Sequence, residues 1–285
     1  METAAHLLVI GAQKSGTTWL QHVLDADRSF WLPPQVQEVH FFDRDYDKGV
    51  NHYRGLYAPA PADKITCDVT PAYLHTPEVA ARIRQSESAL ERPLRFAAIL
   101  REPVSRAVSA YRMRLRKGTT SRSLREEVDA LPKLVDVGLY RRNLDRYLEH
   151  FDRDQLLVLL FEELFGDAHD PLGTLAGFLG LAHPIENNYD GVRVNRGGTR
   201  RHPAADKVLT YGGRVLRGLG WTPVLHRLKR SKAVSGLRKT DAEDFRLSDD
   251  DQLFLEELKE RFRDDVGSLS ALIDRPDLPR VWGYA

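Results

Sequence analysis

Two glycines and a lysine near the N-terminus have the spacing of an anion-binding turn. Gly11 and Gly16 enclose the segment that contains Lys14, and Thr17 and Thr18 follow directly. A strand-to-helix turn with glycine at each end leaves backbone N–H groups free, and the positive end of the helix dipole lies beside them. Both features favour a bound phosphate or sulfate, and the lysine and the two hydroxyls add donors. The turn is therefore predicted to bind an oxyanion.

The turn departs from the loop of nucleotide triphosphatases at one position. Such loops have lysine directly after the second glycine, whereas Thr17 stands there in this chain and the lysine is Lys14. This arrangement resembles the phosphosulfate-binding loop of sulfotransferases that use 3′-phosphoadenosine 5′-phosphosulfate (PAPS). The resemblance implies that the donor is bound by Lys14, Ser15, Gly16, Thr17, Thr18 and Trp19. A generic glycine turn of an α/β protein is the alternative.

Three ionisable side chains, Glu38, His40 and Asp43, lie among apolar neighbours in the segment 37–43. A partly buried helix start whose charges face water is one interpretation of this segment. The heparan sulfate sulfotransferases and their bacterial relatives carry a similar Glu-Val-His-Phe-Phe motif at a similar distance from the loop. The resemblance implies that Glu38 is the general base on the acceptor hydroxyl. It also implies that His40 and Asp43 lie beside the acceptor, with His40 in the catalytic group.

The stretch Thr70-Pro71-Ala72-Tyr73 resembles the Glu-Lys-Thr-Pro-Ala-Tyr stretch of the same family, which implies a position for Tyr73 on the acceptor side. The family lysine before the threonine is Val69 in this chain. This departure argues against a heparan-like acceptor and leaves Lys14 as the main catalytic cation. Ordinary turn chemistry at Pro71 is the alternative.

An arginine and a serine follow another apolar run. Arg101 comes directly after 94–100, and Pro103 suits the first turn of a helix that carries Ser109. Arg101 would lie at the carboxyl end of a strand, where open α/β sheets bind ligands, and Ser109 is about two helical turns further on. The frame Arg-x-Pro-x-x-Arg-x-x-Ser-x-Tyr resembles the 3′-phosphate motif of PAPS sulfotransferases. The resemblance implies that Arg101 and Ser109 bind this phosphate.

Two later segments are rich in arginine. The loop 192–201 lies where the family has a glycine-containing loop over the 3′-phosphate, which implies donor binding by Gly198, Thr199 and Arg200; a surface turn is the alternative. The basic segment 200–240 holds eleven Lys or Arg and one acidic residue among apolar positions. It is predicted to be a lid or an acceptor-binding element. Contact with an anionic membrane surface and a solvated helix face are the alternatives.

The elements that would position these residues alternate between strands and helices. Unbroken apolar runs are typical of strands in a parallel sheet with both faces covered. We expect strands at 7–10, 30–32, 65–70, 94–100 and 155–161. We expect a helix that begins near Gly16 and others at 77–85, 103–116, 124–131, 140–151, 171–181 and 247–263. With the resemblance, this order implies a three-layer α/β, P-loop-like fold with a central parallel sheet flanked by helices, in a single domain over 1–285.

Composition excludes some classes of protein. The 42 Lys and Arg against 41 Asp and Glu give a formal net charge of +1, which offers no global argument for nucleic-acid binding. The single cysteine, Cys67, excludes an internal disulfide and fits a reducing compartment. No apolar run approaches the length of a membrane span, and the N-terminus leaves no room for a secretory segment. We therefore expect a cytoplasmic protein without a transmembrane segment.

The expected activity is direct, in-line transfer of a sulfuryl group from PAPS to a hydroxyl of a small-molecule, glycan or lipid acceptor. Glu38 would remove the acceptor proton while Lys14 and the loop N–H groups stabilise the departing adenosine 3′,5′-bisphosphate. This scheme requires no metal. Two alternatives stay open: an ATP-dependent small-molecule kinase of P-loop fold, which would need Mg²⁺, and a non-catalytic nucleotide-binding module. The sequence does not select an acceptor or an oligomeric state.

Overall fold

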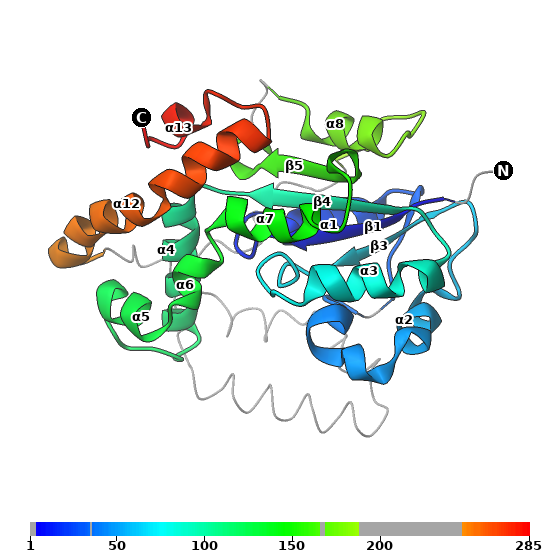
Figure 1. Ribbon diagram of the computed structural model, residues 1–285, viewed down its shortest axis with the longest axis horizontal. Coiled ribbons are helices and arrows are strands. Elements are labelled where there is room, and N and C mark those ends of the chain that lie inside the picture. The colour runs from blue at the N-terminus through cyan, green and yellow to red at the C-terminus, as the bar shows by residue number, and fades with distance from the viewer. Residues whose placement is uncertain (1–3, 35, 166–168, 188–246) are drawn as a thin grey trace, which may run out of the picture. The chain divides into compact units, whose positions relative to one another are not determined.

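The computed structural model describes residues 4–34, 36–165, 169–187 and 247–285 (Figure 1). The chain divides into two compact units. The larger unit comprises 1–111, 122–194 and 249–285, and the smaller one comprises 112–121 and 195–248. The fold described below is that of the larger unit. The organisation of the whole chain as a single domain stays a prediction.

Five parallel strands form the central sheet, in the order β2-β3-β1-β4-β5. They are β1 (His6–Gly11), β2 (Phe30–Trp31), β3 (Ile65–Val69), β4 (Leu94–Leu100) and β5 (Leu156–Leu160). Because β1 is the central strand, its carboxyl end is flanked by the ends of β3 and β4. The predicted α/β fold with a central parallel sheet is confirmed.

Alternating residues of the strands face two different helical layers. On one face, Leu7 and Val9 of β1 belong to a buried core cluster with α1 (Thr17–Ala26) and α8 (Pro171–Phe178). On the other face, Phe96 of β4 packs edge-on against an aromatic ring of the α7 region, with centroids 5.5 Å apart. This alternation follows from the period of two of a β-strand. Covering both faces explains why the strands are mainly apolar.

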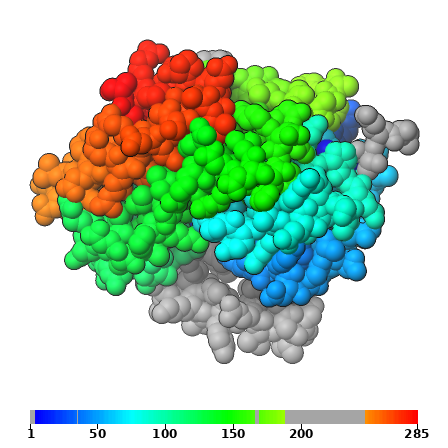
Figure 2. Space-filling model, viewed as in Figure 1, coloured from blue at the N-terminus to red at the C-terminus, as the bar shows by residue number. Residues whose placement is uncertain are grey.

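The helices of the second face lie in front of the sheet in Figure 1. Figure 2 shows that the side chains of α12, α7 and α3 form a continuous covering on this face. The remaining described α-helices are α2 (Val50–Tyr57), α3 (Val79–Leu90), α4 (Pro103–Arg116), α5 (Leu124–Ala130), α6 (Lys133–Asp136), α7 (Tyr140–Leu148), α12 (Asp249–Leu272) and α13 (Leu278–Val281).

Most boundaries agree with the sequence expectations, and the exceptions have physical reasons. α4 has the predicted bounds, and α5 begins where predicted because Ser123 forms a capping box with Glu126. α12 continues past the predicted end at residue 263 because buried Val266 and Leu269 extend its apolar stripe. The segment 37–43 is not one helix: a π-helical turn begins only at Phe41, after a residue in the left-handed conformation.

Candidate functional site

The predicted anion-binding turn lies at the carboxyl end of β1. The Ala12 N–H donates to the carbonyl of Ile99 on β4 at 2.7 Å, which fixes the turn to the neighbouring strand. Lys14 and Gly16 have φ angles of +73° and +95°, in the region that favours glycine. A Cβ on Gly16 would lie 2.9 Å from Cδ1 of Leu164. The turn is therefore closely packed, and a side chain at Gly16 would require Leu164 to shift.

Helix α1 begins directly after this turn and directs its N-terminus toward the same edge of the sheet. Its first residues, Thr17 and Thr18, have no intrahelical acceptor for their N–H groups because of their place in the helix. The side chains of Lys14 and Thr18 are half-buried, whereas those of Ser15 and Thr17 are buried. The turn thus combines a lysine, hydroxyls and a helix N-terminus, which together suit a phosphate or sulfate group.

Arg101, predicted to bind a second phosphate, is in contact with the turn. Its Nη1 donates to the carbonyl of Lys14 at 3.4 Å, and its guanidinium carbon lies 4.5 Å from the centroid of the Phe161 ring. The Arg101 carbonyl accepts a hydrogen bond from the Tyr140 hydroxyl at 2.7 Å. Ser109 is half-buried on α4, about two turns from the helix start. The structure therefore brings the arginine and the lysine turn together.

Two acidic residues fix the backbone beside Arg101. Glu102 caps α4, because its carboxylate accepts from the N–H groups of Val104 at 2.8 Å and Ser105 at 2.6 Å. Its own N–H donates to Glu162 at 3.0 Å, and Glu162 also accepts from the Trp282 indole N–H at 3.2 Å. Glu162 thus has a structural role. It ties the end of β4 to the C-terminal segment.

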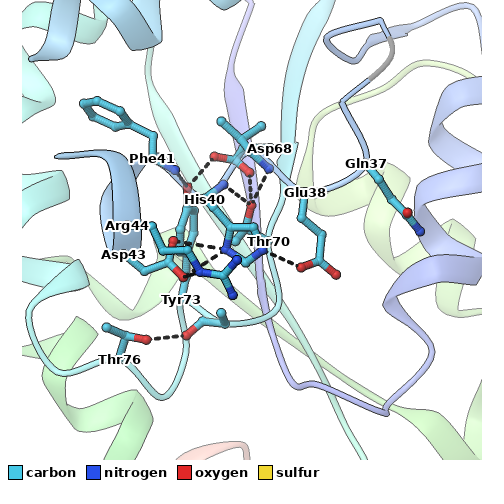
Figure 3. A network of polar contacts seen from close by, with 12 residues as sticks. Gln37, Glu38, His40, Phe41, Asp43, Arg44, Asp68, Thr70, Tyr73 and Thr76 are labelled. Atoms are coloured by element: carbon cyan, nitrogen blue, oxygen red, sulfur yellow. Dashed lines mark hydrogen bonds and ion pairs between the residues drawn. The ribbon is translucent and has the colours of Figure 1, made fainter. Parts of the chain in front are cut away.

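Glu38, His40 and Asp43 meet in one cluster, which we call the acid–histidine triad (Figure 3). His40 Nε2 lies 2.8 Å from Glu38 Oε2, and His40 Nδ1 lies 2.9 Å from Asp43 Oδ2. The His40 ring thus lies between the two carboxylates, with one ring nitrogen facing each of them. The Glu38 side chain is 41% exposed and that of Asp43 is 7% exposed. Glu38 is therefore the most exposed member of the triad.

Hydroxyls from the segment after β3 hold the backbone of the triad. Thr70 Oγ1 accepts from the Val39 N–H at 3.1 Å and from the His40 N–H at 3.4 Å. The Tyr73 hydroxyl accepts from the Phe41 N–H at 2.9 Å. Tyr73 is fully buried, so its hydroxyl contributes to the support of the triad. Its predicted contact with an acceptor stays a prediction.

The hydroxyls of Thr70 and Tyr73 both donate hydrogen bonds to a buried carboxylate, that of Asp68. Its oxygens accept hydrogen bonds from Thr70, Tyr53 and Tyr73. Burial raises the pKa of Asp68 to about 6, although the three hydrogen bonds act in the opposite direction. Burial also raises the pKa of Tyr53 and Tyr73, so both phenols remain neutral donors.

The triad and the anion-binding turn lie at the same edge of the sheet. Gln21, on the helix that follows the turn, donates from its side chain to the carbonyl of Gln37 at 2.6 Å. The Thr70 N–H donates to Val9 O of β1 at 3.1 Å. Trp19, predicted with the turn to bind the donor, is buried in the core, where its ring packs edge-on against Phe165 with centroids 5.4 Å apart. Its donor contact stays a prediction.

Sequence reasoning did not single out Asp68 or Gln21. A signal for Asp68 exists, because Thr66, Asp68 and Thr70 alternate with apolar residues along β3 and its end. This period of two places the three polar side chains on one face of a buried strand, where they need partners. Gln21 has no comparable signal, since a glutamine on a helix is ordinary.

Some of the predicted residues lie outside the described part of the chain. They are Gly198, Thr199 and Arg200, together with the basic segment 200–240. Among the residues that the structure describes, no group of three or more His, Cys, Asp or Glu is arranged to hold a metal ion. None of the helices described is both long and apolar enough to span a bilayer.

Comparison with known proteins covers the region that holds the site. Residues 4–193 match the family model described as a sulfotransferase domain. Heparan sulfate glucosamine 3-O-sulfotransferase 3B1 of Homo sapiens is 33% identical over 195 residues, which are 64% of this chain and 47% of that protein. Heparan sulfate glucosamine 3-O-sulfotransferase 6 of Mus musculus is 31% identical over 202 residues, 67% of this chain and 56% of that protein. The chain thus spans about half the length of these relatives.

A solved structure shares the fold. The crystal structure of a sulfotransferase from Alicyclobacillus acidocaldarius superposes with a TM-score of 0.62 and covers 98% of both chains, at 24% sequence identity. Its central sheet and flanking helices therefore correspond to those described above.

Proposed function

The chain belongs to the sulfotransferase family, and we propose that it transfers a sulfuryl group from PAPS to a hydroxyl group of an acceptor. The observation that carries this proposal is the contact between Arg101 and the Lys14 turn at 3.4 Å, beside the acid–histidine triad at the same edge of the sheet. Two anion-binding groups in contact suit one donor that carries both a phosphosulfate and a ribose phosphate.

The transfer that we propose is a direct, in-line displacement at sulfur. Glu38 takes the proton of the acceptor hydroxyl as the acceptor oxygen forms its bond to sulfur. The bond between sulfur and the bridging oxygen of PAPS breaks, and adenosine 3′,5′-bisphosphate leaves with the electron pair. Lys14 and the N–H groups at the start of α1 stabilise the charge that develops on this oxygen. His40, held by Asp43, orients the Glu38 carboxylate toward the acceptor.

The two other functions considered from the sequence have less support. An ATP-dependent kinase of this fold would use a lysine directly after the second glycine, where Thr17 stands. The family match also disfavours a kinase. A non-catalytic nucleotide-binding module would have no need for the contact between His40 and Glu38 at 2.8 Å.

For the acceptor we propose a hydroxylated small molecule, glycan or lipid. The relatives reported above act, by their names, on heparan sulfate glucosamine, which supports a sugar hydroxyl. Val69 stands in place of the lysine expected in the heparan enzymes. This departure supports an acceptor that differs from heparan sulfate. We also propose a cytoplasmic location, because the sequence has a single cysteine, Cys67, and therefore no internal disulfide, which fits a reducing compartment.

Replacement of the proposed base tests this function. In Glu38→Gln, transfer of labelled sulfate from PAPS to an acceptor in an extract of the producing cells should fall by about 10²- to 10⁴-fold. Affinity for adenosine 3′,5′-bisphosphate, measured by calorimetry, should stay within about twofold, because the donor groups are intact. Asp47→Asn is the matched control, since Asp47 is an exposed acid outside the triad.

Two results would contradict the proposal. Unchanged transfer in Glu38→Gln would exclude Glu38 as the base. Tighter binding of ATP than of PAPS and adenosine 3′,5′-bisphosphate would instead favour the kinase. Identification of the compound that gains label in the extract names the acceptor.

A further inference from the structure

Asp68 is a fully buried carboxylate on β3, beneath the acid–histidine triad. Its Oδ1 accepts a hydrogen bond from Thr70 Oγ1 at 2.6 Å. Its Oδ2 accepts from the hydroxyls of Tyr53 at 3.0 Å and Tyr73 at 3.1 Å. Figure 3 shows Asp68, Thr70 and Tyr73 next to the triad residues. Three hydroxyls thus donate to one buried carboxylate.

The direction of the Thr70 hydrogen bonds is fixed by the backbone. An N–H group can only donate, so Thr70 Oγ1 is the acceptor for Val39 at 3.1 Å and His40 at 3.4 Å. The hydroxyl proton of Thr70 is then free to point to Asp68. Thr70 therefore links the backbone of the triad to the buried carboxylate.

Tyr73 makes the same kind of link to the next two residues, Phe41 and Phe42. Its hydroxyl oxygen accepts from the N–H groups of Phe41 at 2.9 Å and Phe42 at 3.3 Å. Its proton is directed to Asp68 Oδ2. Four successive N–H groups, those of residues 39–42, are thus held by two hydroxyls, and both hydroxyls give their protons to Asp68.

A third hydroxyl connects Asp68 to a neutral histidine. Tyr53 gives its proton to Asp68. In the 2.7 Å hydrogen bond between Tyr53 and His6, the imidazole Nε2–H is therefore the donor. His6 Nδ1 then accepts from Thr66 Oγ1 at 2.7 Å. Burial lowers the pKa of His6 to about 3, which agrees with a ring that has one donor and one acceptor. The direction of donation therefore leads from Thr66 through His6 and Tyr53 to Asp68.

We propose that Asp68 is a positioning residue of the transfer reaction: its carboxylate, through Thr70 and Tyr73, fixes the backbone of residues 39–42 and so brings the members of the triad together. Only an ionised carboxylate accepts on both oxygens, because an amide or a protonated acid presents a donor on one side. His40 has a φ of +55°, which is uncommon for residues other than glycine, and its N–H contact helps to hold it there. The inference rests on the proposed function in one respect, that the triad acts in transfer.

Two threonines, Thr66 on β3 and Thr70 directly after it, provide the test. Thr70→Val removes the hydroxyl that links Asp68 to the triad and keeps the shape of the side chain. Thr66→Val makes the same change at a residue that is also fully buried, but whose hydroxyl reaches Asp68 only through His6 and Tyr53 and is not the acceptor for the N–H groups of residues 39–42. Thr70→Ser, which retains the hydroxyl, is the rescue variant.

The first readout is hydrogen exchange of residues 37–45, measured by mass spectrometry on the full-length protein. Thr70→Val should speed exchange in this segment about tenfold, since it loses hydrogen bonds from two N–H groups. Thr66→Val and Thr70→Ser should leave this exchange within about twofold of the unmodified protein. This readout needs no acceptor and no catalysis.

The second readout is sulfate transfer at saturating PAPS. Thr70→Val should lower the rate about tenfold or more, with unchanged affinity for adenosine 3′,5′-bisphosphate, whereas Thr66→Val should retain the rate. Equal exchange in Thr70→Val and Thr66→Val, or equal transfer rates, would overturn the inference. If the unmodified protein transfers no sulfate but exchange responds as expected, the proposed function fails while the support of the triad by Asp68 stands.

Tyr73→Phe provides an independent measurement of the second link. It removes the hydroxyl that holds Phe41 and Phe42, and exchange of these two amides should increase while those of Val39 and His40 change less. If Tyr73→Phe leaves exchange of all four amides unchanged, the tyrosine link from Asp68 is excluded.

Discussion

His75 is a buried imidazole, and its surroundings predict that the protein loses stability in acid. The residue is 8% exposed, and within the described part of the chain neither ring nitrogen has a hydrogen-bond partner. Burial lowers the pKa of His75 from 6.5 to about 3, and the charges of Lys133, Arg106 and Arg146 act in the same direction. The folded protein therefore holds this ring neutral at a pH where an unfolded chain would protonate it.

The size of the effect follows from linkage. Between the folded pKa of about 3 and the unfolded value of 6.5, the unfolded chain binds more protons at residue 75. The free energy of unfolding therefore falls as the pH falls through this range. At about pH 5 the difference is about 1.5 pH units, and about 1.4 kcal/mol for each unit gives a loss of about 2 kcal/mol relative to neutral pH.

Two other buried groups also contribute to the pH dependence, so the measurement has to be a difference between variants. His6, with its pKa lowered to about 3, acts with the same sign as His75. Asp68 acts with the opposite sign, because burial raises its pKa to about 6 and the folded chain then binds its proton more readily. Its contribution to stability decreases as the pH rises toward this value.

Urea denaturation at about pH 5 and about pH 7.5 isolates the contribution of His75. His75→Leu and His75→Gln should both remove about 2 kcal/mol of pH dependence, because neither side chain titrates. At the higher pH the two variants should differ, since only glutamine buries a polar group without partners. If both variants keep the pH dependence of the unmodified protein, burial does not hold His75 neutral and the reasoning fails.

Two further substitutions test contacts near the ends of β1 and β4. Gly16→Ala should cost about 1 kcal/mol more in unfolding free energy than Gly180→Ala, because both glycines have positive φ but a Cβ has open space only at Gly180. Gly16→Ala should also weaken binding of adenosine 3′,5′-bisphosphate. Equal costs of the two substitutions in urea denaturation would contradict this. Trp282→Phe should lower the unfolding free energy by about 1 kcal/mol, because Glu162 loses an indole donor; an unchanged denaturation midpoint would show that this contact contributes nothing.

The sequence was sufficient for the sheet because burial on both faces leaves a simple pattern. The segments that form β1, β4 and β5 are mainly apolar, as expected for strands covered on both faces. Helix α2 was not expected, since Val50–Tyr57 contains polar residues and a glycine, and only Tyr53 is buried. Its position depends on long-range packing of that one ring, which local sequence does not encode.

The charged residues of the candidate site stand out in the sequence, but the groups that hold them do not. Glu38 and His40 stand out as ionisable residues among aromatic ones, whereas the support from Asp68 depends on a strand that lies 30 residues later in the chain. Glu162 and Trp282 are 120 residues apart, and only the fold brings them together. Sequence patterns report local periodicity, and these contacts have none.

The order of the strands explains why the two parts of the site lie where they do. From β1 the chain proceeds through α1 toward β2 on one side, and from β4 it proceeds toward β5 on the other, so the loops after β1 and β4 diverge (Figure 1). Open α/β sheets bind ligands at such a divergence, and the Arg101 contact with the Lys14 carbonyl lies there. The triad is anchored instead through Thr70, after β3, on the opposite side of β1. Because different strands support the proposed donor and acceptor sides, we expect substitutions after β4 to weaken nucleotide binding, and substitutions after β3 to slow transfer without changing that affinity.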